Sequence, residues 1–186
     1  VTTAASGQLA LIGSSLALNN AITVGVGSLA LTSGSALTLA HALTAPNAVT
    51  LNTTHQGISG NGVITANQLL INSGTGSATL GGTQQVNTVN ATAGSLALVN
   101  GKSLTVNGIT VGDSANVSAT GSSSDLTLAG AVTAGNAGQA HGAPAIVLSA
   151  GRNFINNVGS AVLNAGTGSW RVYSTSPLSD TRNGLM

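Results

Sequence analysis

The chain of 186 residues is 42% hydrophobic but only 4% charged, with a net charge of +1 and no cysteine. Disordered chains combine low hydrophobicity with high charge, so disorder is excluded, and the few cations make no basic patch for nucleic acid. Gly, Ser, Thr or Asn interrupts every apolar run well before the roughly 18 residues that a membrane-spanning helix needs. We therefore expect a folded chain with no nucleic-acid partner and no membrane span.

Short apolar triplets recur at nearly even steps from the start of the chain. Each triplet is apolar, small or polar, then apolar, and a turn of Gly, Ser, Asn or Thr follows it. The first triplets begin at Leu9, Leu16, Ile22, Leu29 and Leu37. A strand as short as a triplet cannot bury its own apolar face, whereas coils stacked on one another can. The spacing therefore predicts a repeat solenoid.

The pattern continues with looser spacing to about residue 172, and segments 53–62 and 134–143 interrupt it. No segment shows a helical period, and the strand spacing is shorter than the 8–12 residues usual in sandwiches. Steps of about 6–8 residues, grouped in threes, give coils of about 20 residues. We predict an all-β, right-handed parallel β-helix with three strands per coil and about nine coils. The rod should occupy residues 1–176 of a longer protein, and residues 177–186 should leave it as a tail.

Alternation along a strand predicts which side chains point inward. The two apolar residues of a triplet should face the core, and the middle residue should face solvent. The inward residues include Leu16, Leu29, Leu96 and Leu126, and the outward ones include Ala17, Ala30, Ala97 and Thr127.

The C-terminal part of the chain carries a sharper pattern, in which Ile146, Phe154, Val162 and Trp170 are evenly spaced. Ser149 to Asn157, Val162 to Pro177, Asp180-Thr181 and Gly184-Leu185 form successive motifs. Together these motifs resemble the end of the β-helix in filamentous-haemagglutinin-like exoproteins of Gram-negative two-partner secretion. The resemblance implies a secreted adhesin stalk at the bacterial cell surface, exported by an outer-membrane secretion partner. Such a stalk binds a host cell, matrix or another bacterium, or spaces a binding tip.

Catalytic and metal-binding motifs do not emerge from the sequence. His41, His55 and His141 are scattered without metal-ligand spacing, and Glu is absent. The sequence separation of Asp113 and Asp125 is no multiple of the expected coil length, so a catalytic carboxylate pair is disfavoured. We expect a non-catalytic protein without cofactor or metal, and a polysaccharide-lyase-like enzyme is disfavoured.

Binding residues are expected where the chain departs from the regular coil, because loops on a rigid scaffold commonly carry binding groups. The partner would be a surface receptor or glycan. Candidate contacts are His55, Gln56, Asn136, Gln139, His141, Arg171 and Tyr173, whereas Phe154 and Trp170 are expected to fill the core. Candidate glycosylation sites, from Asn-x-Ser/Thr triplets, are Asn52, Asn90 and Asn116.

Two alternative functions fit the same fold. An ice-binding β-solenoid would need a regular Thr-x-Thr array on one face, whereas the outward residues here vary among Ala, Thr, Gln and Asn. A passive spacer in a toxin-delivery exoprotein would need no binding site on this segment.

Overall fold

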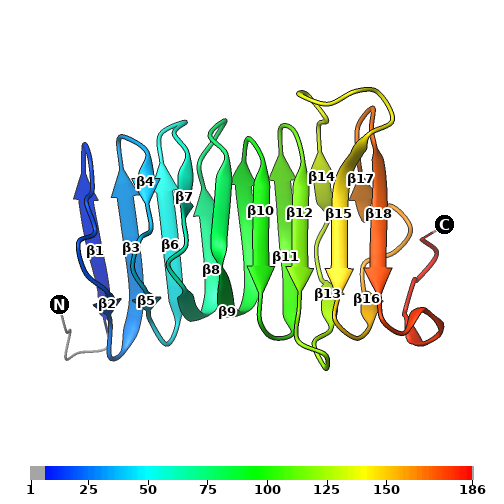
Figure 1. Ribbon diagram of the computed structural model, residues 1–186, viewed down its shortest axis with the longest axis horizontal. Coiled ribbons are helices and arrows are strands. Elements are labelled where there is room, and N and C mark those ends of the chain that lie inside the picture. The colour runs from blue at the N-terminus through cyan, green and yellow to red at the C-terminus, as the bar shows by residue number, and fades with distance from the viewer. Residues whose placement is uncertain (1–6, 186) are drawn as a thin grey trace.

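A single stack of parallel strands makes up the computed structural model, which describes residues 7–185 (Figure 1). Strands account for 55% of the chain, and they form about 8 turns of roughly 20 residues. The only helical segment among the described residues is a short 3-10 turn, η1 (Pro177–Ser179). The predicted all-β solenoid is therefore confirmed. The described residues contain no helix with the length and hydropathy needed to cross a membrane.

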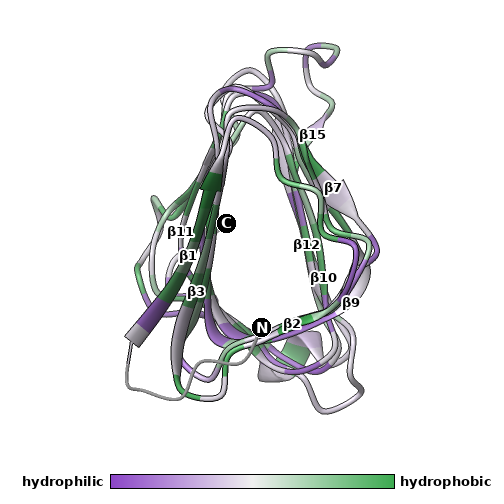
Figure 2. Ribbon diagram, turned by 90° about the vertical axis from the view of Figure 1, so that its left-hand side faces the viewer, coloured by the Kyte–Doolittle hydropathy of each residue, from purple (hydrophilic) through white to green (hydrophobic). Residues whose placement is uncertain are grey.

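Three faces give each coil a triangular cross-section (Figure 2). The three faces are here numbered 1, 2 and 3. Strands β8 (Ile64–Asn72), β9 (Ala78–Ala93) and β11 (Leu104–Val111) bend around corners, so each of them contributes to more than one face. Face 1 also contains β1 (Gly7–Gly13), β3 (Gly27–Ser33), β6 (Ala48–Thr53), β14 (Val132–Ala134) and β17 (Leu163–Asn164). Face 2 also contains β4 (Leu37–Thr38), β7 (Ile58–Gly60), β10 (Leu96–Asn100), β12 (Ala115–Ala119), β15 (Pro144–Ala150) and β18 (Ser169–Ser174). Face 3 also contains β2 (Ile22–Thr23), β5 (Leu43–Thr44), β13 (Leu126–Leu128) and β16 (Phe154–Asn156).

Coil length is regular in the first half of the rod and irregular in the second. On face 1, Leu9, Leu29, Val49, Leu69 and Val89 are paired in succession, and the step along the sequence is the same each time. The later face 1 pairs are Ala91 with Ile109, Ile109 with Val132, and Val132 with Leu163. The first of these steps is shorter than the regular coil, and the other two are longer. Loops consume the additional residues, so the rod has about 8 turns rather than the predicted nine.

The core confirms the predicted alternation of side chains. Leu29, Leu96 and Leu126 are at most 2% exposed, whereas Ala17 is exposed and Ala97 is half-buried. Leu16 is only half-buried, because it belongs to the first described coil and has a described neighbouring coil on one side only. Phe154 is buried at the far end of the core, as predicted. Trp170 packs against the core, but part of the Trp170 side chain is exposed.

Corners between faces use glycine and buried amides. Gly27 has φ +96°, and a Cβ there would collide with the Gly7 carbonyl oxygen of the neighbouring coil, so glycine is required. Asn100 is fully buried, and its Oδ1 accepts the Val86 N–H at 3.0 Å. Its Nδ2 donates to the carbonyl oxygens of Val86 and Lys102 at 2.9 and 2.8 Å. Such amides satisfy backbone groups that lose their regular partners where the chain turns.

The C-terminal segment, expected to leave the rod after residue 176, stays hydrogen-bonded to it. Thr181 forms a parallel bridge with Ile155 of β16. The Asn156 Nδ2 donates to the Arg182 carbonyl oxygen at 2.9 Å, and Leu185 packs against the core. The segment thereby supplies hydrogen-bond partners to backbone groups of Phe154 and Asn156 in β16.

We predict opposite outcomes for charges placed at adjacent positions of β10. Leu96→Asp should lower the free energy of unfolding by more than about 4 kcal/mol, because it buries an unpaired carboxylate. Ala97→Asp should lower it by less than about 1 kcal/mol, because the side chain points to solvent. Chemical denaturation of both variants measures the difference, and equal losses would contradict the assigned alternation.

Candidate functional site

One long edge of the rod, where face 1 turns into face 2, carries both irregular segments (Figure 1). The corner at residues 54–57 joins β6 to β7, and the loop at residues 135–143 joins β14 to β15. Between them lies a hollow of about 340 Å³, here called the edge groove. Its lining includes Gly74, Thr75, Gly94, Ser95, Asp113 and Ala137. The groove thus crosses three successive corners and ends beneath the loop.

His55 lies at the start of the edge groove in a left-handed backbone conformation, with φ 60°. Its side chain stacks on the next coil, where Nδ1 is 3.3 Å from the Thr75 Oγ1 and 3.4 Å from the Thr75 nitrogen. Gln56 follows as an exposed residue, and its carbonyl oxygen accepts a hydrogen bond from the Thr53 hydroxyl. The structure therefore places both residues beside the groove with exposed side chains.

Asp113 holds the loop at the other end of the groove. Its Oδ1 accepts the Gly138 N–H at 3.1 Å, and its Oδ2 accepts from the Gln139 amide at 3.3 Å. Its carbonyl oxygen also accepts the Asn136 N–H at 2.9 Å. Gln139 and His141 remain exposed. Sequence reasoning considered Asp113 only as half of a disfavoured carboxylate pair, because its proximity to the distant Gly138 becomes apparent only once the coil length is known.

Asn136 is buried, whereas a residue that contacts a ligand is expected at the surface. It is 3% exposed, with φ 58°, and its Nδ2 donates to the Thr167 hydroxyl at 3.2 Å and to the Ala140 carbonyl oxygen at 3.4 Å. Its Oδ1 is buried without a hydrogen-bond partner. Asn136 therefore positions the base of the loop from within the rod.

Arg171 and Tyr173 lie apart from the edge groove, on the outer surface of β18. They are paired with Val147 and Ser149 of β15 and are both exposed. Asn90 and Asn116, the middle and last candidate glycosylation sites, are exposed on faces 1 and 2, whereas Asn52 is half-buried. The seven candidate contacts therefore divide between the long edge and the last strand.

Polar residues form a column on the outside of face 1, a feature that sequence reasoning missed. Its seven members pair in succession and are Thr32, Asn52, Asn72, Thr92, Thr110, Thr133 and Asn164. The adjacent column is mixed, since Ala30, Thr50, Leu70, Asn90 and Gly108 follow one another. This surface therefore lacks the regular Thr-x-Thr array that an ice-binding face would need.

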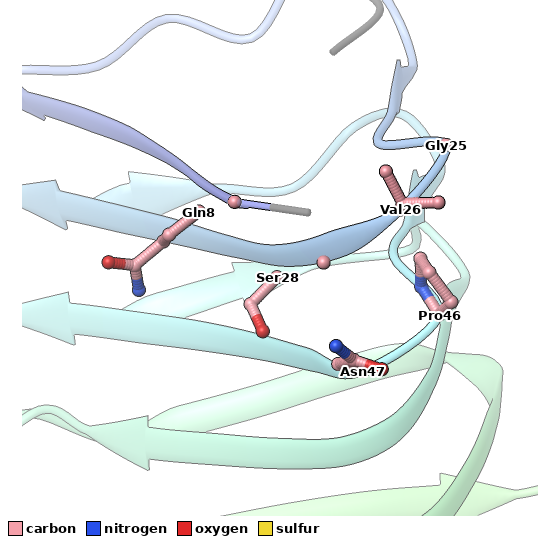
Figure 3. Close-up of a pocket in the computed structure, with 8 residues that line it drawn as sticks. Gln8, Gly25, Val26, Ser28, Pro46 and Asn47 are labelled. Atoms are coloured by element: carbon pink, nitrogen blue, oxygen red, sulfur yellow. The ribbon is translucent and has the colours of Figure 1, made fainter. Parts of the chain in front are cut away.

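A second hollow, of about 610 Å³, lies at the edge where face 3 turns into face 1 (Figure 3). Gln8, Ser28 and Asn47 supply amide and hydroxyl groups there, and Val26 and Pro46 supply apolar ones. Among residues 7–185, no titratable side chain lines this hollow. It therefore offers hydrogen bonds but no charge, unlike the edge groove with Asp113.

All three aspartate side chains of the chain accept a backbone N–H from a neighbouring coil. Asp113 accepts from Gly138, Asp125 accepts from Asn153 at 3.2 Å, and Asp180 accepts from Phe154 at 2.8 Å. No group of three or more His, Cys, Asp or Glu side chains in residues 7–185 is arranged to hold a metal ion. The aspartate side chains therefore link neighbouring coils through hydrogen bonds.

Asp125 also forms the ion pair of the described chain, with Arg152. The Arg152 Nε donates to Oδ1 at 2.8 Å, and the side chains of Arg152 and Asp125 are 50% and 17% exposed. The hydrogen bonds from Arg152 and, to a smaller extent, from the Asn153 N–H lower the pKa of Asp125, against an opposing effect of burial. Exposure of the guanidinium to water and salt keeps the stabilisation small.

Comparisons of the chain with protein-family models, with curated proteins and with solved structures gave no match. None of the three comparisons therefore supports the expected resemblance to filamentous-haemagglutinin-like exoproteins.

We predict that the contribution of Asp125 to stability depends on pH. Because its pKa is lower in the folded than in the unfolded state, the stabilisation is present above the unfolded-state pKa and disappears as pH falls through the folded-state value. Asp125→Asn should therefore be less stable than the parent at neutral pH, and the difference should shrink in acid. Urea unfolding across pH tests this, and a difference that is constant with pH would contradict it.

We also predict that Asp113 restrains the loop. Asp113→Ala removes both side-chain hydrogen bonds, so the Gly138 amide should exchange hydrogen several-fold faster while amides of β12 and β15 keep their protection. Thr110→Ala is the matched control, because Thr110 is exposed on face 1, where it is paired with Thr92 and Thr133. Unchanged exchange at Gly138 would show that Asp113 does not hold the loop.

Proposed function

We propose that this chain is a non-catalytic rod segment of a secreted bacterial surface adhesin, and that the edge groove and its loop contact a receptor or glycan. The observation that carries the proposal is the loop at residues 135–143, which Asp113 and Asn136 hold in place on a rigid edge. A loop restrained in this way loses little entropy on binding. The exposed residues His55, Gln139 and His141 belong to the two segments that join face 1 to face 2.

The family, the export route and the localisation are part of this proposal and rest on the C-terminal motifs. Asn156, from the first motif, bonds the Val158 and Gly159 N–H groups and the Arg182 carbonyl oxygen. Asp180 and Thr181, from a later motif, bond Phe154 and bridge to Ile155. The motifs thus have a structural reason to occur together, which supports the resemblance to exoproteins of two-partner secretion and, with it, an outer-membrane secretion partner.

A passive spacer is the competing interpretation of the same rod. A loop that hydrogen bonds hold in place favours the adhesive interpretation over the spacer interpretation, because a passive spacer needs no such loop. The ice-binding alternative has less support, given the mixed columns on face 1. An enzyme also has less support, because each aspartate is occupied by a backbone N–H group.

The loop is tested by exchanging only its exposed part. Residues 137–141 are replaced by a Gly-Ser segment of equal length, which keeps Asn136 and Gly142 in place. The other end of the groove is tested with the double variant His55→Ala with Gln56→Ala, which leaves β7 intact.

We expect beads coated with either edge variant to bind cultured epithelial cells and a neutral glycan array less than parent beads, with an unchanged melting curve. Thr38→Ala with Asn107→Ala is the matched control, because both residues are exposed, on β4 and β11, and neither is a candidate contact. If the parent binds neither probe, or if both edge variants bind as the parent does, the spacer interpretation replaces the adhesive one.

A further inference from the structure

A second long edge of the rod, where face 3 turns into face 1, carries a hollow of about 600 Å³, here called the axial trough. The trough adjoins the hollow of Figure 3, since Gly25 and Pro46 line both. It extends over successive coils from Thr23 to Lys102. The trough and the edge groove share no described residue.

One wall of the trough is a column of side chains that form hydrogen bonds. Thr23, Thr44, Thr65 and Gln85 pair in succession along face 3, one from each coil. Thr23 and Thr65 are exposed, and Thr44 and Gln85 are half-buried. Because neighbouring coils are about 4.8 Å apart, the column offers a hydroxyl or amide group at that repeat.

The floor of the trough is recessed because the next residue of each coil points into the core. Val24, Ala45 and Ala66 are 1%, 1% and 6% exposed. The Val24 N–H donates to the Thr44 carbonyl oxygen at 2.8 Å, and the Ala45 N–H donates to the Thr65 carbonyl oxygen at 3.0 Å. The corner therefore continues the ladder between coils, which makes the trough rigid and commits its backbone to contacts within the rod.

The opposite wall carries a pair of side-chain amides. The Asn87 Nδ2 donates to the Asn67 Oδ1 at 2.9 Å, and both residues are exposed. This bond uses one donor of Asn87 and one lone pair of Asn67, so both amides keep donors and acceptors for a ligand. Pro46 adds apolar surface to the same wall.

The trough ends at Lys102, the single lysine of the chain. The coil at this point is short, since Thr88 pairs with Thr105, and the buried Asn100 side chain bonds the Val86 backbone in place of a strand. Lys102 is half-buried and takes part in no ion pair within residues 7–185. Among the described residues that line the trough, it supplies the one charge.

This lining favours one class of ligand. An anionic polymer is bound by several cations, and the trough has one. An extended peptide repeats about every 3.3 Å, which does not match the spacing of the coils. One residue of a straight glycan has nearly the length of that spacing. Its hydroxyl groups also match Thr, Asn and Gln side chains, which both donate and accept hydrogen bonds.

We propose that the axial trough binds a straight, uncharged, β-linked polysaccharide, with one sugar residue over each coil. The threonine column and Gln85 bond hydroxyl groups on one side of the glycan, and Asn67 and Asn87 bond those on the other. Pro46 contacts the C–H groups of a sugar ring. The trough is separate from the edge groove, so different variants test this proposal and the adhesive one.

The ligand class is tested by NMR titration of the isotope-labelled chain, read at the side-chain amides of Asn67, Gln85 and Asn87. NMR suits the weak binding expected here, because no aromatic side chain is among the described residues that line the trough. Cellohexaose, a straight β-linked glycan, should shift these signals, and maltohexaose, its coiled α-linked isomer, should not. Affinity should rise from cellobiose to cellotetraose, because the longer chain reaches more coils. Equal responses to the two hexamers, or no response to either, would overturn the proposal.

The site is tested with Thr44→Val and Thr65→Val together, which remove two hydroxyl groups and keep the shape of the side chains. We expect the affinity for cellohexaose to fall by about tenfold, with an unchanged melting curve. Thr92→Val with Thr110→Val is the matched control, because these exposed residues pair with each other on face 1, and it should bind as the parent does. Unchanged affinity of the trough variant would show that the threonine column does not bind the glycan.

An acidic glycan is the competing occupant. A hexamer of β-linked mannuronate should bind no more tightly than cellohexaose, and Lys102→Gln should leave the affinity for cellohexaose almost unchanged. If the acidic hexamer binds, cellohexaose does not, and Lys102→Gln abolishes that binding, the trough takes an anionic ligand and the proposal fails.

Discussion

Backbone hydrogen bonding between neighbouring coils is the interaction on which this rod depends. Very short strands, such as β2, β4 and β5, have no stability of their own, and each is held by a parallel partner in the next coil. The same stacking places inward side chains directly above one another, so a continuous core forms from residues that are apolar but otherwise varied. It also explains how a chain with 4% charged residues folds, because neither the ladder nor the core needs charge.

This dependence also determines where function can lie. Side chains on the faces are spaced by the ladder, whereas corners are the places where the backbone leaves it. Each corner frees N–H and C=O groups that need other partners. The three aspartates and the buried Asn100 and Asn156 supply them. These aspartate and asparagine side chains therefore hold the segments that leave the regular coil, and the largest of these segments is the loop above the edge groove.

The predicted fold was accurate where short-range pattern decides it. Leu29, Leu96 and Leu126 were correctly assigned to the core, because alternation along a strand depends only on local geometry. The number of turns was overestimated, because the long step between Val132 and Leu163 contains loops that triplet spacing does not count. Both irregular segments were identified from the sequence, but not their position on one edge. Asn136 was expected at the surface and is buried, because a loop residue's direction depends on the coils around it.

The sequence by itself determined the class of fold, the inward and outward alternation, and the segments that leave the coil. These properties follow from spacing and residue type within a few neighbours. Only the tertiary structure decided that His55 approaches Thr75, that Asp113 accepts the Gly138 N–H, and that Asp180 accepts the Phe154 N–H. The physical reason is the coil length, which is constant over the first coils and varies over the later ones. Residues become neighbours only when the whole length of the intervening coil is known, and that length depends on how every corner is packed.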